Sequence, residues 1–109
     1  MSITGRFYFK QTDSGNLLGE FSNNSMSVNS TESADIVKNE ANAFIGDYKS
    51  SWIEDGEAEL LNLKIELKIN TKIYKLIWFK ANADEPAFWG EGFLVDKMLI
   101  GNYQDFPIK

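Results

Sequence analysis

The sequence predicts an all-β protein, an antiparallel up-and-down meander of about seven strands forming a small closed or nearly closed barrel. Short segments of alternating apolar and polar residues are separated by turn residues, without the alternation of strands and helices typical of parallel sheets. Eight Phe, four Tyr and three Trp, with only two Pro, also favour strands and a core of large flat side chains. The length of 109 residues suits one domain, spanning 1–109.

The first elements form a hairpin. Aromatic residues dominate 5–10, the segment 11–16 supplies the Asp, Ser, Gly and Asn typical of a loop, and 17–22 runs back. Two alternatives stay open for the polar segment that follows. Ser or Thr near Thr31, with Glu32 in the first turn, could begin a short helix over 33–41. The same residues could instead form an irregular excursion or a short extra strand.

The middle of the chain alternates clearly. Phe44, Tyr48 and Trp52 share one face of a strand over 44–53, with small residues between them that leave room for a neighbour or a ligand. The segment 61–69 then has one apolar and one polar face. The next strand, 73–80, places three large side chains on one face: Tyr74, Leu76 and Trp78.

The last predicted hairpin runs from Phe88 to Tyr103, with a tight turn at Asp96 and Lys97. Its three glycines suggest a strongly curved sheet, because a glycine inside a strand often marks a bulge or a bend. A Gly-x-aromatic pattern recurs along the chain, as a curled barrel would need around its circumference. It occurs at Gly5–Phe7, Gly19–Phe21, Gly46–Tyr48 and Gly101–Tyr103.

Composition excludes several kinds of function. There is no His and no Cys, so Ser-His and Cys-His catalysis, thiolate metal sites and disulfides are excluded. A formal charge of −5 disfavours nucleic acid as a partner. No cofactor motif is present, and the acidic segment 54–57 lacks the ligand spacing of a calcium loop. No signal-like or membrane-spanning apolar run is seen, so we expect neither export nor membrane insertion and a cytoplasmic location.

Two stretches resemble the avidin and streptavidin family. Residues 2–7 are similar to its opening strand, and Trp78, the loop after it and 88–96 are similar to a strand Trp followed by Phe-x-Gly-x-x-Phe. The resemblance implies a calycin-like barrel whose open end holds a small ligand, with Trp78 and Phe88 at aromatic pocket positions. The chain carries Phe9 where the family has a polar ligand-binding residue and Phe21 where it has a pocket Tyr, so the resemblance implies a pocket rather than a particular ligand.

We therefore expect a non-enzymatic barrel that binds a small hydrophobic or amphipathic ligand. The predicted ligand-binding residues are Tyr48, Trp52, Trp78 and Phe88. The alternative is a protein-interaction or inhibitor module whose barrel is filled by its own side chains and whose outer surface is acidic or aromatic. Self-association into a homodimer fits either function.

A third class, an enzyme, would need two carboxyl groups facing one cavity with separated pKa values. The acidic residues considered for such a pair are Glu91 with Asp96, Asp47 or Glu20. Their spacing is unspecific, and carboxylates that alternate with apolar residues usually lie on the solvated face of a sheet, so catalysis is the least favoured function.

Overall fold

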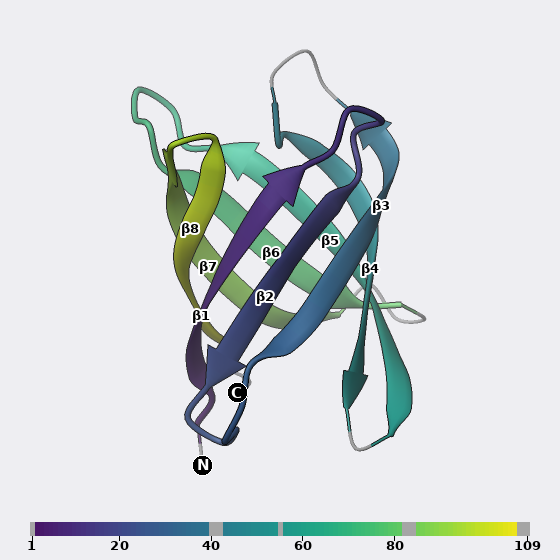
Figure 1. The fold of residues 1–109 in the computed structure, drawn as a ribbon. Helices are drawn as coiled ribbons and strands as arrows, with labels where there is room; N and C mark the ends of the chain where they lie inside the picture. The colour runs from purple at the N-terminus through teal and green to yellow at the C-terminus, as the bar shows by residue number, and fades with distance from the viewer. Residues whose placement is uncertain (1, 40–42, 55, 82–84, 107–109) are drawn as a thin grey trace.

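The computed structural model describes residues 2–39, 43–54, 56–81 and 85–106. Eight antiparallel strands follow one another around a closed barrel (Figure 1). The strands are β1 (Thr4–Gln11), β2 (Leu17–Asn23), β3 (Ser30–Asn39), β4 (Gly46–Glu54), β5 (Glu57–Leu67), β6 (Tyr74–Lys80), β7 (Pro86–Val95) and β8 (Met98–Asp105). The predicted all-β meander is confirmed, with eight strands.

The barrel closes because β1 pairs with both β2 and β8. Phe7 lies opposite Phe21 on one side and Gly101 on the other. The beginning of β1 and the end of β8 therefore lie at the same end of the barrel, the lower end in Figure 1. Closure leaves no unpaired strand edge within the sheet.

The short helix considered over 33–41 is wrong for the described part of that range, because 33–39 belong to β3; residues 40 and 41 lie outside the described residues. The strand pairs with β2 on one side and β4 on the other. A helix here would leave the facing edges of β2 and β4 without hydrogen-bond partners, so the strand pairing overrides the local helix-start signals.

The Gly-x-aromatic repeat lies on the inner face of the barrel. Each glycine is two residues from its aromatic partner, so the two point the same way. A Cβ atom on Gly5 would lie 2.6 Å from a ring carbon of Tyr103, and one on Gly19 would lie 2.9 Å from a ring carbon of Phe9. The glycines thus make room for aromatic rings from neighbouring strands, which lets the sheet curl tightly.

The upper end of the barrel in Figure 1 is filled by a network around Tyr48, which is 1% exposed. Its hydroxyl donates to the carbonyl oxygen of Phe44 at 2.8 Å and accepts from Gln11 Nε2 at 3.1 Å. Gln11 Oε1 accepts from the backbone N–H of Phe44 at 2.8 Å. Phe44, predicted to begin a strand, instead precedes β4 with a φ of 70° and still packs into the core.

The predicted turn at Asp96 and Lys97 is confirmed, and both residues have positive φ, 53° and 69°. This is the backbone of a type I′ hairpin turn, whose twist matches the strands it joins. Ile69, which continues the apolar alternation of β5, lies beyond the end of that strand and is 86% exposed.

Replacing Gly101 with Ala tests the close packing of the inner face. A Cβ atom there would overlap the Glu91 carbonyl oxygen and lie 2.7 Å from the Gly92 Cα. We expect a loss of about 3 kcal/mol in the free energy of unfolding, because backbone on the neighbouring strand must move. Gly56→Ala is the control: its φ is 81° but no atom lies within 4 Å, so backbone strain alone should cost about 1 kcal/mol. Equal losses in urea denaturation would contradict the account.

Candidate functional site

The other end of the barrel, where β2 leads into β3 and both termini lie, contains a pocket inside the wall, here called the inner pocket. Its volume is about 290 Å³, close to the lower limit for small-molecule sites. A water molecule occupies about 30 Å³ in the liquid, so the inner pocket has room for about ten water-sized groups. It is lined by Ile3, Phe7, Phe21, Asn23, Ser25, Met26, Ser30, Glu32, Trp52, Ile53, Trp78, Phe88 and Tyr103.

Six of the lining residues are aromatic, and their rings contact one another. Phe21 packs edge-on against Trp52, with ring centroids 5.6 Å apart, and against Tyr103 at 6.2 Å. Tyr103 in turn contacts Trp78 at 5.9 Å and Phe88 at 5.8 Å. Such tilted and edge-to-face contacts fix the rings relative to one another, so the shape of the inner pocket is set before any ligand enters.

The carboxyl group of Glu32 is the polar centre of the inner pocket. Glu32 lies on β3 opposite Gly19 of β2 and Trp52 of β4, and it is 4% exposed. Its Oε2 accepts a hydrogen bond from Trp78 Nε1 at 2.9 Å and a short one from Ser50 Oγ. Donors from β4 and β6 therefore fix the orientation of one carboxyl group on β3.

The second carboxyl oxygen, Oε1, has no hydrogen-bond partner among the described residues. No side-chain oxygen or nitrogen of those residues is both fully buried and without a partner. Because Glu32 lines the inner pocket, Oε1 is the oxygen that opens into it. This leaves one acceptor position for a bound molecule.

Burial raises the pKa of the Glu32 carboxyl from 4.5 to about 7, because the charged form loses its hydration. The hydrogen bonds from Ser50 and Trp78 act in the opposite direction, since they favour the carboxylate. The net effect places the change of charge near neutral pH, which is unusual for a glutamate.

Three of the four predicted ligand-binding residues come together: Trp52, Trp78 and Phe88 all line the inner pocket. Tyr48 does not, although it shares the inner face of β4 with Trp52. Four residues of a strand span about 13 Å, at about 3.3 Å per residue, so Tyr48 reaches the filled end instead. Alternation in the sequence predicts the face of a side chain but not its height in the barrel.

The carboxylates considered for an acid–base pair lie outside the inner pocket. Glu91 pairs with Lys68 at 2.8 Å, and Asp96 is exposed in its turn. Asp47 and Glu20 occupy outward positions of β4 and β2. Part of the acidic segment 54–57 lies outside the described residues, which contain no group of three or more potential metal ligands.

Sequence reasoning missed Glu32 because it was read as a helix-start residue. A signal was present: Glu32 alternates with Ala34 and Ile36, and all three face inward. A carboxylate on the apolar face of a strand is rare unless something requires it there.

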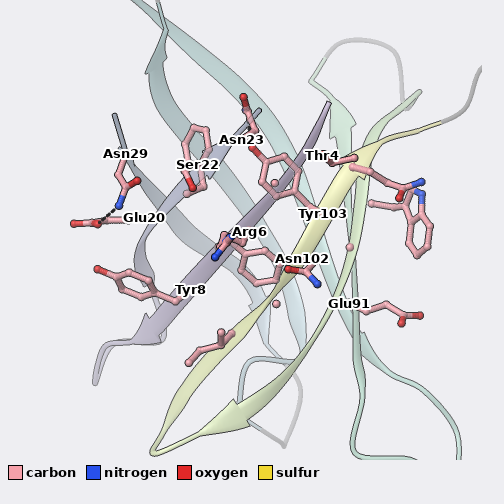
Figure 2. Close-up of a pocket in the computed structure, with 18 of the residues that line it drawn as sticks. Thr4, Arg6, Tyr8, Glu20, Ser22, Asn23, Asn29, Glu91, Asn102 and Tyr103 are labelled. Atoms are coloured by element: carbon pink, nitrogen blue, oxygen red, sulfur yellow. Dashed lines mark hydrogen bonds between the residues drawn. The ribbon is translucent and has the colours of Figure 1, made fainter. Parts of the chain in front are cut away.

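A second, larger depression lies on the outside of the barrel over β1, β2, β7 and β8, and has a volume of about 1220 Å³. Figure 2 shows Arg6, Tyr8 and Asn102 along it, with Asn29 donating to Glu20 Oε1 at 3.4 Å at its edge. This outer depression is open to solvent and contains no buried polar group. It lacks the convergent groups that mark the inner pocket as the candidate site.

Comparison with protein families, with characterised proteins and with solved structures finds no match to this chain. Within the described residues, no helix is long and apolar enough to cross a lipid bilayer. The case for a function therefore rests on the geometry of the site.

Glu32→Gln tests whether the buried carboxyl destabilises the protein when ionised. Its folded pKa of about 7 lies above the ordinary 4.5, so ionisation costs nothing below pH 4.5 and about 3 kcal/mol above pH 7. Gln keeps the shape and an acceptor oxygen without the charge. We expect the variant to gain stability relative to the parent as pH rises from 4 to 8, by about 3 kcal/mol.

Urea denaturation across this pH range measures the difference. Glu91→Gln, which removes a carboxylate on the outer face, is the control and should not reproduce the gain expected of Glu32→Gln. A constant difference for Glu32→Gln would contradict the raised pKa.

Proposed function

We propose that the protein binds a small organic molecule in the inner pocket. The observation that carries this proposal is a cavity of about 290 Å³, lined largely by aromatic side chains, in which the carboxyl group of Glu32 has one oxygen, Oε1, left as an acceptor. Ligand sites are typically apolar concavities with a few well-placed polar groups, and this pocket has that composition.

The polar groups near the opening are consistent with selection of a ligand. Asn23 Nδ2 donates to the Tyr103 hydroxyl at 2.9 Å, while Ser25 and Ser30 line the pocket beside it. The aromatic wall supplies apolar contact area, and these groups with Glu32 supply orientation. The avidin-like resemblance of 88–96 and Trp78 supports the same class of function.

Two other functions have less support. An acid–base enzyme needs a second titratable group near the first, and Glu32 is the only carboxylate among the described residues that line the inner pocket. An interaction module with a filled barrel does not need a cavity of this size. Exposed Phe93, Leu94 and Val95 on β7 favour a second copy or another protein as an additional partner, without replacing the pocket.

Filling the inner pocket tests the proposal. Ser30→Phe places a ring in the pocket, whereas Ser22→Phe places the same ring on the outer side of β2 at the same end of the barrel. Saturation-transfer NMR with a panel of small aromatic alcohols and amines measures binding. We expect binding by the parent and by Ser22→Phe, and at least a tenfold weaker affinity for Ser30→Phe, because the added ring occupies the ligand volume.

Circular dichroism and thermal melting check that both variants keep the barrel. Unchanged binding by a folded Ser30→Phe variant, or no binding of any panel member to the parent, would contradict a ligand site in the inner pocket.

A further inference from the structure

The inner pocket holds a buried carboxylate without a cation. The described residues that line it include no Lys and no Arg. Ser50 and Trp78 donate hydrogen bonds to Oε2 but carry no charge. An unpaired charge in a buried site is costly, so the Glu32 carboxyl group either takes up a proton or is paired with a cation, and the described lining residues supply no cation.

Aromatic side chains from several other strands line the pocket together with Glu32. Trp52 comes from β4, Phe21 from β2, Trp78 from β6, and Tyr103 from β8. Aromatic rings attract cations through the negative potential of their faces, most strongly when water is excluded. A bound anion would be repelled by the charged form of Glu32, and the repulsion would be strong because the effective dielectric constant inside the barrel is low.

The charged residues at this end of the barrel also favour a positively charged ligand. Glu57, Glu59 and Asp105 lie at strand ends on this side of the barrel, and Glu85 lies just before β7. The ammonium group of Lys80 lies 3.5 Å from a Glu85 carboxyl oxygen. Acidic groups around a cleft raise the local concentration of cations.

From these observations we infer that the ligand of the inner pocket is a small organic cation, a primary or secondary amine attached to an aromatic or other apolar body. One N–H of the ammonium group donates to Oε1 of Glu32, and the apolar body packs against the aromatic wall. This inference rests on the proposed function and names the ligand class for the same site.

The inference requires binding to weaken as Glu32 is protonated. The described pocket residues from β1, β2, β4, β6, β7 and β8 include no carboxylate, Lys or Arg, and Tyr103 is the one titratable side chain among them. The carboxyl has a pKa of about 7 in the free protein, and the amine keeps its charge throughout this range. Affinity should therefore fall about tenfold from pH 8 to pH 6, and about another tenfold for the next unit.

Three probes of one shape test the ligand class by isothermal titration: 2-phenylethylamine, 2-phenylethanol and 3-phenylpropionate. At pH 8 we expect the amine to bind at least tenfold more tightly than the alcohol, and the propionate to bind least. Glu32→Gln should remove the preference for the amine while leaving alcohol binding within about threefold, because Gln keeps the shape but not the charge. Glu91→Gln, with a carboxylate lost from the outer face, should bind like the parent.

The outcomes separate the two proposals. Equal binding of amine and alcohol, or an amine affinity that does not change between pH 8 and pH 6, would overturn the cation inference while the binding pocket stands. No binding by any of the three would overturn both. The pH dependence is measured on the unchanged protein, so the test does not depend on the folding of a variant.

Discussion

The hydrogen-bonded carboxyl group of Glu32 inside an aromatic barrel is the constraint on which the rest of the site depends. Its Oε2 is held by Trp78 and Ser50 from two other strands, so the group is fixed across the barrel rather than mobile. The same arrangement leaves Oε1 toward the inner pocket without a charged partner. Ionising a carboxyl group in that position lowers the free energy of unfolding of the ligand-free protein. A buried carboxyl group kept at this cost is better explained by a role in ligand binding than by a role in folding stability.

The barrel can hold this group because its two ends differ. At one end Tyr48, Gln11 and Phe44 satisfy one another and fill the interior. At the other end large rings contact each other at their edges and leave space between them. Inward-facing glycines contribute to this packing, since Gly5 and Gly19 leave room for the rings of Tyr103 and Phe9 on neighbouring strands. Closure of the sheet between β1 and β8 then keeps the wall rigid around the site.

Local patterns predicted much of this fold. Alternation identified most strands, the turn at Asp96 and Lys97, and the shared face of Leu76 and Trp78, because these depend on neighbouring residues. The sequence did not decide between a helix and a strand for the segment that forms β3. Its polar residues have weak intrinsic preferences, and pairing with β2 and β4 determines its conformation. Glu32 was missed for the same reason: its importance comes from Ser50 and Trp78, which are distant in sequence. Three of the six aromatic residues that line the inner pocket, Trp52, Trp78 and Phe88, were predicted as ligand-binding, and its carboxyl group was not.

Two properties of Glu32 can be tested together: its pKa near neutral pH, and the stabilisation of its ionised form by a bound cation. The ¹³C NMR shift of the Glu32 side-chain carboxyl carbon, followed from pH 3 to pH 9, measures both directly. The account predicts a midpoint near pH 7 for the protein alone and a midpoint lowered by at least one pH unit with saturating 2-phenylethylamine. A midpoint near the ordinary value of 4.5 without ligand, or a midpoint that saturating amine leaves unchanged, would contradict it.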